Sequence, residues 1–163
     1  MNIFILDKNP KIAAEMLCDK HVVKMILESA QMLCATHWLA ESSAPYKLTH
    51  AKHPCNLWLL ESIKNYDWLL THAICLCFEY TKRYHKIHKS QPIIEWCCAN
   101  KPNLPKKSRT PFPQAMPEEY KDNDSVKAYQ QYYLGEKLGF ARWRNSEIPK
   151  FIESKIPCLR HRL

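Results

Sequence analysis

One segment of the chain, CDKHVVKMILESAQML at residues 18–33, sets ionisable side chains into an otherwise apolar stretch. Its polar positions step by three, four and three residues: His21, Lys24, Glu28 and Gln31. This spacing places them on one face of a helix, where a carboxylate and an amine are groups that acid–base and nucleophilic catalysis use. The same spacing is also typical of a solvated face with a Lys24–Glu28 ion pair, and Asp19 is then only a helix cap.

A second polar cluster, THAKHPC at residues 49–55, carries His50 and His53 where the next long helix is predicted to begin. If the two helices pack antiparallel, these histidines approach Gln31, His37 or Glu28 rather than His21. Imidazole and carboxylate groups together can bind a divalent metal ion, although no HExxH pattern is present. The alternative metal site consists of Asp19, His21, Glu28, His50 and His53.

Basic residues give the chain a formal net charge of +8 and a pI near 9.1. Such an excess favours a polyanionic partner, with nucleic acid ahead of a membrane surface. Several cations stand beside aromatic residues, which can stack on unpaired bases or can instead face the core. By charge pattern, the candidate nucleic-acid contacts are Lys82, Arg83, Lys106, Lys107, Arg109, Arg142 and Arg144.

Composition predicts one mainly α-helical, compact domain around a long central helix. The chain has 163 residues, 46% of them hydrophobic, and only two glycines, which disfavours a sheet of many tight hairpins. Its eleven prolines cluster between apolar segments, as helix punctuation does. We expect a helical domain over residues 1–153, with a long Pro-rich loop at about 99–121, and a basic C-terminal tail at 154–163.

The eight cysteines show no C-x-x-C or zinc-ribbon spacing, and most stand among apolar residues as small hydrophobes do. The apolar run at the start is too short for a secretory signal, so we expect reduced thiols in an intracellular compartment, the cytoplasm or nucleus of a host cell. No apolar stretch approaches the roughly 18 residues of a membrane span, so no membrane association is expected.

Helix periodicity and capping residues predict the elements that position these groups. Residues 2–7 are either a strand fragment or a buried arm. Asn9 is the predicted cap of a short helix that has Pro10 at its first position. The remaining predicted elements are a helix from 19 or 20 to about 40, a loop at 41–54, a helix at 54–86 and a helix from 124 or 125 to 144.

Most of the chain is similar to a group of short proteins from phages and large DNA viruses. It also remotely resembles the pyrimidine-dimer DNA glycosylases of the phage endonuclease V type. Their Asp-x-His signature and later catalytic Glu correspond to Asp19, His21 and Glu28, and the His that opens their central helix corresponds to His53. Their aromatic C-terminal segment resembles YQQYYLGEKLGFARW at residues 129–143. The resemblance implies a compact helical protein that flips a base and cleaves DNA at ultraviolet lesions.

The chemistry that the resemblance implies needs an amine to attack the sugar C1′ and form a Schiff base, and a carboxylate to stabilise the cationic sugar and move protons. The family uses its N-terminal amine, because an α-amino group has an ordinary pKa of about 7.7 to 8.0 against about 10.4 for lysine. Here Asn2 follows Met1, so we expect Met1 to be retained and its own amine to react. Leu27 stands where the family has an Arg that holds DNA, so Lys20 or Lys24 is expected to replace it.

The resemblance assigns Glu28 the central catalytic role and places His53 across the cleft from it. Asp19 and His21 are expected to orient the helix start and the phosphate or sugar. The expected catalytic residues are Met1, Asp19, His21, Lys24, Glu28 and His53.

The sequence therefore predicts a DNA-binding protein, with DNA preferred over RNA, that acts without a cofactor as a lesion or modified-base glycosylase with AP-lyase activity. Two alternatives stay open. One is a metal-assisted nuclease or hydrolase that uses a divalent ion at the His/Asp/Glu cluster. The other is a non-catalytic nucleic-acid-binding viral accessory protein.

Overall fold

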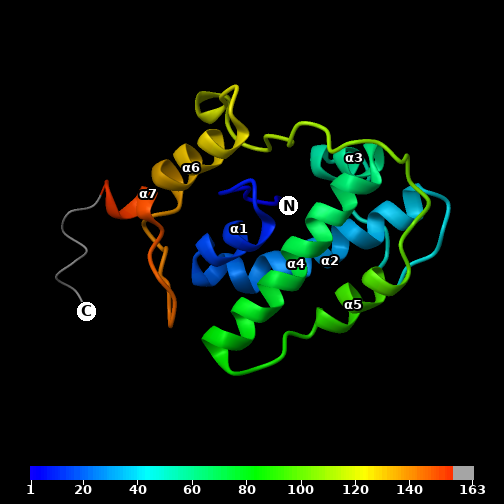
Figure 1. The fold of residues 1–163 in the computed structure, drawn as a ribbon, viewed down its shortest axis with the longest axis horizontal. Coiled ribbons are helices and arrows are strands. Elements are labelled where there is room, and N and C mark those ends of the chain that lie inside the picture. Colours follow the sequence, from blue (N-terminus) through cyan, green and yellow to red (C-terminus); the bar gives the residue numbers. More distant parts are fainter. Residues whose placement is uncertain (156–163) are drawn as a thin grey trace.

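The computed structural model describes residues 1–155, and every regular element within them is a helix (Figure 1). This confirms the predicted mainly α-helical fold. The elements in chain order are α1 (Pro10–Met16), α2 (Asp19–Leu39), α3 (Pro54–Glu61), α4 (Ile63–Tyr84), α5 (Gln91–Ala99), the 3₁₀ helix η1 (Glu118–Tyr120), α6 (Ser125–Glu136) and α7 (Lys150–Glu153). Residues 156–163 of the predicted basic tail lie outside the described part.

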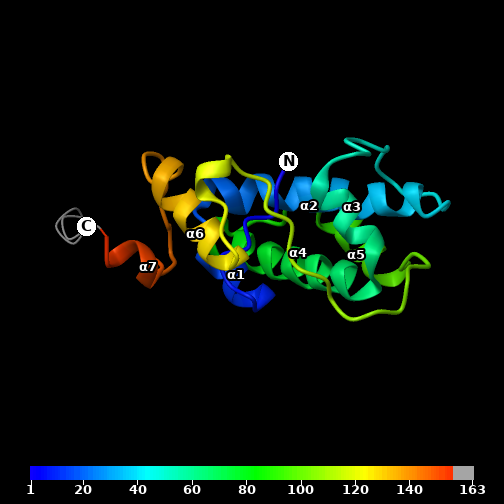
Figure 2. The ribbon, with the colours of Figure 1, turned by 90° about the horizontal axis from the view of Figure 1, so that it is seen from above.

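The central helix is α4, which packs against α1, α2, α3 and α5. One hydrophobic core runs through these helices and takes in the N-terminal arm and α6. Figure 1 shows the N-terminus near the middle of the molecule, and the view from above in Figure 2 places it over α2. In the part of the chain that is described, no helix combines the length and the apolar character that a membrane crossing demands.

The first two helices begin where the local signals predict. Asn9 caps α1 because its side-chain oxygen accepts hydrogen bonds from the backbone N–H groups of Lys11 and Ile12, at 2.9 and 3.3 Å. Pro10 occupies the first turn, where no N–H is needed. For residues 2–7 the sequence left two alternatives, a strand fragment or a buried arm, and the structure shows the buried arm. Residues 3–6 are at most 5% exposed, and Phe4 has a positive φ of 57°.

The prediction of a single helix at 54–86 is wrong, because the helix is interrupted at Ser62 and the segment forms two helices, α3 and α4. Ser62 is extended, with φ −160° and ψ 141°, and its hydroxyl donates to the Lys107 carbonyl at 2.6 Å. The next N–H, of Ile63, donates to the Pro105 carbonyl at 2.9 Å. The Pro-rich connection between α5 and α6 therefore docks on the break, and Figure 1 shows it passing α3 on its way to α6.

Two other elements differ from the prediction: α6 is shorter, and α5 is an additional helix. The last long helix, α6, ends at Glu136 rather than at 144, and residues 137–149 return without regular helix toward α2, where the Asp19 N–H donates to the Arg142 carbonyl at 2.8 Å. The helix α5 was not predicted. It starts with Pro92 in its first turn and buries Ile94 and Cys97 against the core.

Candidate active site at the N-terminus

The polar stripe of α2 is divided by burial. Lys24 is exposed, but Glu28 is only 8% and His21 only 6% exposed. A solvated helix face would leave all of these groups in water, so the stripe is more than a solubilising face. The two buried groups belong to different environments, which the neighbouring elements determine.

Three nitrogen atoms surround the Glu28 carboxylate, one as a hydrogen-bond donor and two as ion-pair partners. Its Oε2 atom accepts a hydrogen bond from the Asn2 backbone N–H at 3.1 Å and lies 3.9 Å from the Met1 amine nitrogen. Its Oε1 atom lies 3.6 Å from Lys24 Nζ. A nearly buried carboxylate is costly unless it is paired in this way. The structure thus brings the chain's α-amino group to the carboxylate at the centre of the stripe.

The N-terminal residue is itself held in place. The side chain of Met1 is only 3% exposed and packs against the hydrophobic core. Its amine therefore does not move on a free tail but sits at the surface of the core, next to Glu28.

His53 lies beside the same two groups. As the N-cap of α3, its Nδ1 atom accepts a hydrogen bond from the Cys55 N–H at 3.1 Å, which leaves the ring proton on Nε2. Burial lowers the pKa of His53, and the N-terminal ammonium and His50 lower it further, while the Met1 backbone and the Glu28 carboxylate act in the opposite direction. His53 is therefore neutral near pH 7 and neighbours both Met1 and Glu28.

Cys55 lies near Met1 and Glu28, but its thiol is a poor nucleophile. Burial raises the pKa of the Cys55 thiol to about 12, and the nearby Glu28 charge adds to this while the N-terminal ammonium opposes it. A thiol with such a pKa is protonated at neutral pH and is a poor nucleophile. The amines are the nucleophiles that remain at this site.

His21 is placed away from the amine and holds the N-terminal arm. Its ring stacks on Phe4 with centroids 4.2 Å apart, and its Nδ1 atom lies 2.7 Å from the Tyr133 hydroxyl. Burial first, then the charges of Lys137 and Lys24, lower the pKa of His21 to about 4. The buried, neutral ring of His21 therefore joins the start of α2 to the N-terminal arm, and its role toward phosphate or sugar stays a prediction.

Asp19 and Arg83 form an ion pair, which corrects the prediction for Arg83. Arg83 Nη1 lies 3.1 Å from Asp19 Oδ1, and its Nε donates to Glu79 Oε2 at 3.0 Å. Because the Arg83 side chain is fully buried, the prediction that it contacts nucleic acid is wrong. Asp19 also accepts from the Arg144 N–H at 3.0 Å, so its carboxylate binds groups of the protein at the start of α2, and its role toward phosphate or sugar stays a prediction.

The alternative metal set is not assembled. Asp19 pairs with Arg83, His21 lies on Phe4 and Tyr133, and only Glu28, His50 and His53 come near one another. Within residues 1–155, no three His, Cys, Asp or Glu side chains are grouped so that they could hold a metal ion.

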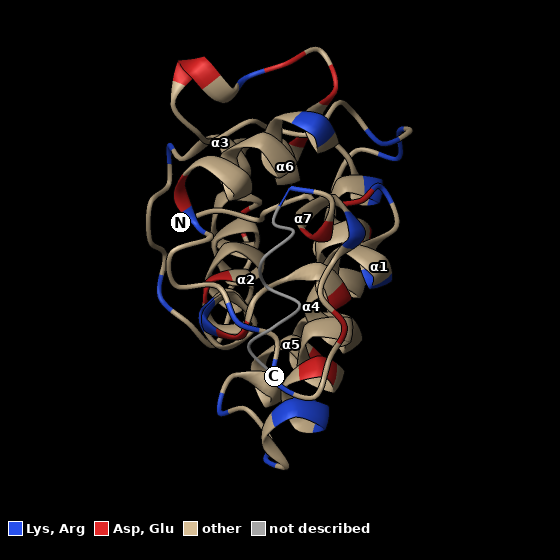
Figure 3. Ribbon diagram, turned by 90° about the vertical axis from the view of Figure 1, so that its left-hand side faces the viewer, with Lys and Arg blue, Asp and Glu red and all other residues tan. Residues whose placement is uncertain are grey.

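The other predicted nucleic-acid contacts are exposed but spread over the surface. Lys82 pairs with Glu79 at 3.4 Å, and Arg109 lies over the Phe112 ring with its guanidinium carbon 4.0 Å from the centroid. The remaining exposed cations of that set are Lys106, Lys107, Arg142 and Arg144. Figure 3 shows basic residues on several loops and helix ends, with acidic segments between them, rather than in one stripe.

Two further residues at this site, Lys137 and Asn2, owe their importance to long-range contacts. Lys137 lies with its Nζ 4.6 Å from the Tyr132 ring centroid and 5.8 Å from that of Phe4, beside the arm. Asn2 donates to Glu28 through its backbone and is bonded through its side chain to α6. No local sequence signal distinguishes either residue. The contacts that matter here, of Lys137 with Phe4 and of Asn2 with Glu28 and Tyr129, join residues more than 20 positions apart.

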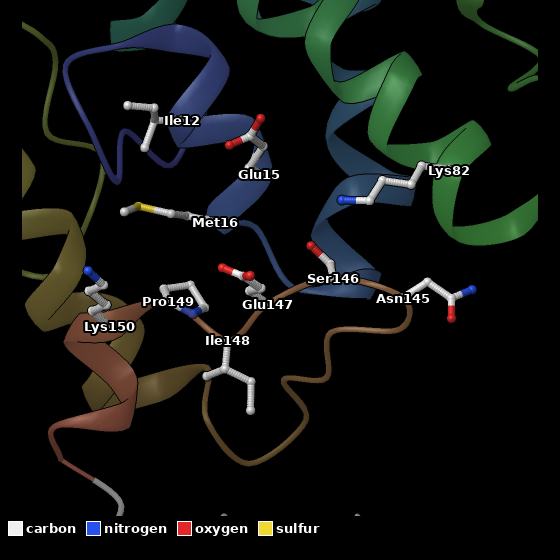
Figure 4. Close-up of a pocket in the computed structure, with 10 residues that line it drawn as sticks. All are labelled: Ile12, Glu15, Met16, Lys82, Asn145, Ser146, Glu147, Ile148, Pro149 and Lys150. Atoms are coloured by element: carbon white, nitrogen blue, oxygen red, sulfur yellow. The ribbon is translucent and has the colours of Figure 1, made fainter.

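A cavity of about 640 Å³ lies elsewhere, between the end of α1, Lys82 and residues 145–150 (Figure 4). It is lined by charges of both signs, Glu15 and Glu147 against Lys82 and Lys150. Of the residues that the sequence singled out, it contains only Lys82. The N-terminal site is therefore identified by its assembled charges and not by a deep cavity.

Comparison with known proteins gives one match. The sequence model of a family described as pyrimidine dimer DNA glycosylase matches residues 1–92, more than half of the 163 residues. The matched part contains the N-terminal arm and the helices α1 to α4, and so all of Met1, Glu28 and His53. No curated protein and no solved structure gives a significant match.

Proposed function

The chain belongs to the pyrimidine dimer DNA glycosylase family, and from this premise we propose that it excises a base from DNA through an imine formed by its own N-terminal amine. The observation that carries the proposal is the 3.9 Å separation between the Met1 amine nitrogen and Glu28 Oε2. A nucleophilic amine beside a carboxylate that can take up and return protons is the pair that this chemistry requires.

In the proposed reaction the amine attacks C1′ of the sugar while the bond from C1′ to the base breaks, and the base leaves with the electron pair and takes up a proton. Loss of the amine protons and opening of the sugar ring then give the imine. Glu28 stabilises the positive charge that develops on the sugar and carries protons between these atoms. Removal of a proton from C2′ then expels the 3′ phosphate, which is the strand-cleaving lyase step.

The neighbouring groups support this assignment. Lys24 lies 3.6 Å from Glu28 Oε1, where it can neutralise the carboxylate or contact a phosphate. His53 is neutral and lies near the Met1 backbone, so it can neighbour the N-terminal residue without adding a positive charge beside the amine. Because Lys24 is also an amine near Glu28, the experiment has to distinguish it from Met1.

The test is borohydride trapping of the protein with its native N-terminus on labelled duplexes that contain an abasic site, a thymine dimer or no lesion. We expect a covalent adduct with the lesion-bearing duplexes that is lost when extra residues precede Met1 and is retained in Lys24→Ala. Glu28→Gln should abolish turnover while DNA binding persists, and Glu15→Gln, an exposed carboxylate on α1, is the matched control. An adduct that survives the N-terminal extension and disappears in Lys24→Ala would assign the nucleophile to Lys24.

The absence of an adduct on every duplex would overturn the imine mechanism. Activity that chelators abolish and one divalent ion restores would then point to the metal-assisted alternative, because the imine route requires no metal.

A further inference from the structure

Asn2 is buried and every polar atom of its side chain is paired. It is 8% exposed, and its Nδ2 donates to the Ala115 carbonyl at 2.7 Å. Its Oδ1 accepts from the Ile3 N–H at 2.8 Å and from the Tyr129 hydroxyl at 2.9 Å. With the backbone N–H on Glu28, residue 2 is tied to four separate points of the structure.

The groups that hold Asn2 are themselves fixed. Tyr129 on α6 is fully buried, and burial raises the pKa of its hydroxyl well above the ordinary value, so the proton stays available for donation. The same hydroxyl lies 3.0 Å from the Pro113 carbonyl and accepts from the Ala115 N–H at 3.3 Å. The intervening Gln114 is anchored by its side chain, which donates to the Asp122 carbonyl at 2.6 Å. The 113–115 segment is therefore a rigid support rather than a loose loop.

We infer that Asn2 is a positioning residue: its carboxamide, held by Tyr129 and Ala115, fixes the backbone from which the Met1 amine projects toward Glu28. The inference rests on the proposed function for its catalytic meaning. Apart from the adjacent Ile3 N–H, the partners of the carboxamide, Ala115 and Tyr129, lie outside residues 1–92, the part that matches the family. The reacting groups thus belong to the matched part of the chain, while the remainder supplies the support that aims the nucleophile.

The chemistry of an amide suits this position. Asn2 must present a donor to a carbonyl and an acceptor to an N–H and a hydroxyl, and among side chains of this size only the amide does both. Asn2→Leu has nearly the same shape but leaves buried partners unpaired. Asn2→Asp keeps the acceptor for Ile3 and Tyr129 and loses the donor to Ala115. Both substitutions keep a residue at position 2 that does not promote removal of Met1.

The first measurement is the single-turnover rate of borohydride trapping on an abasic duplex, as a function of protein concentration. For Asn2→Leu and Tyr129→Phe we expect a tenfold or larger fall in the rate at saturation with an unchanged half-saturating concentration, and an intermediate rate for Asn2→Asp. Tyr66→Phe is the matched control, because it removes a buried hydroxyl bonded to His37 and Cys97 rather than to the N-terminal arm. Wild-type rates at saturation in both Asn2→Leu and Tyr129→Phe would overturn the inference.

A second measurement does not depend on activity. The Met1 amine is acylated with an amine-reactive ester under native conditions, and the modified fraction is quantified by peptide mass spectrometry against Lys11, which is exposed. We expect slow acylation in the wild type and in Tyr66→Phe, and several-fold faster acylation in Asn2→Leu and Tyr129→Phe. Equal rates in all four proteins would overturn the inference that Asn2 and Tyr129 hold the Met1 amine in place. This outcome can be read even if no protein forms an adduct and the proposed function has failed. If Asn2→Leu does not fold, Tyr129→Phe carries both measurements.

Discussion

Arg83 on α4 lies 3.1 Å from Asp19 at the start of α2, and this buried ion pair joins the two helices at the end where the chain also returns from α6. The guanidinium donates as well to the backbone carbonyls of Leu17 and Glu15, at 2.7 and 3.0 Å. It therefore closes the C-terminal end of α1 and the N-terminal end of α2 together. Its role is structural, and the direction of α2 that carries Glu28 depends on it.

Arg83→Met should destabilise the protein by about 3–5 kcal/mol, because it leaves Asp19, Glu79 and two carbonyls buried without their partner. Urea unfolding at pH 7 measures this change. Lys82→Met, whose exposed ammonium pairs with the same Glu79, is the control and should cost no more than about 1 kcal/mol. Equal midpoints for the two variants would show that the buried pair is not what holds these helix ends.

Leu27→Arg should strengthen DNA binding. Leu27 is 40% exposed on α2, next to Glu28, so a longer cationic side chain fits without entering the core. One added phosphate contact should steepen the dependence of log Kd on log salt by about 1 and raise affinity several-fold at low salt. Fluorescence anisotropy over a salt series measures both quantities.

Ile12→Arg makes the same chemical change at a position of similar exposure, 39%, on α1. If it strengthens binding as much as Leu27→Arg does, the gain comes from net charge alone and α2 does not face the DNA.

Lys137→Gln and Lys20→Gln should each weaken DNA binding and lower the salt slope by about 1. Lys137 lies beside the Phe4 arm, and Lys20 lies over the Phe140 ring with its Nζ 5.0 Å from the centroid, so both flank the start of α2. The matched control is Lys101→Gln, since Lys101 pairs with Asp67 at 2.7 Å. A salt slope that changes as much for Lys101→Gln would remove the assignment of this face.

Stability should fall as the pH is lowered from about 6.5 toward 4. Burial lowers the pKa of both His21 and His72 to about 4, so the unfolded chain binds more protons than the folded one in this range. The contribution of the two neutral histidines to the free energy of unfolding is complete above pH 6.5, the ordinary pKa of histidine in the unfolded chain. It is lost as the pH falls toward 4, by up to about 3 kcal/mol for each histidine. Unfolding by urea at half-unit steps of pH gives this curve.

His72→Gln isolates one of the two groups, because Gln keeps a donor for the Pro10 carbonyl that His72 bonds at 2.9 Å but does not titrate. We expect a clearly shallower loss between pH 6.5 and 4 in this variant, whatever its stability at pH 7. An unchanged slope would mean that His72 is not held neutral in the folded protein.

Local signals predicted the elements that depend on neighbours in sequence. The cap at Asn9, the proline at the start of α1 and the span of α2 were predictable because helix capping and helix period involve residues a few positions apart. The break at Ser62 was not predictable. It depends on carbonyls of Pro105 and Lys107, more than 40 positions away, which compete for groups that a continuous helix would use.

The candidate site shows the same division. By itself the sequence determined that His21, Lys24 and Glu28 share a helix face, because that follows from 3.6 residues per turn. Only the tertiary structure decided that Glu28 meets the N-terminal amine while His21 faces Phe4, and that Arg83 is buried while its neighbour Lys82 is exposed. Burial and ion pairing depend on which distant segments fill the space around each side chain, and the helical period of a single segment contains no information about those segments.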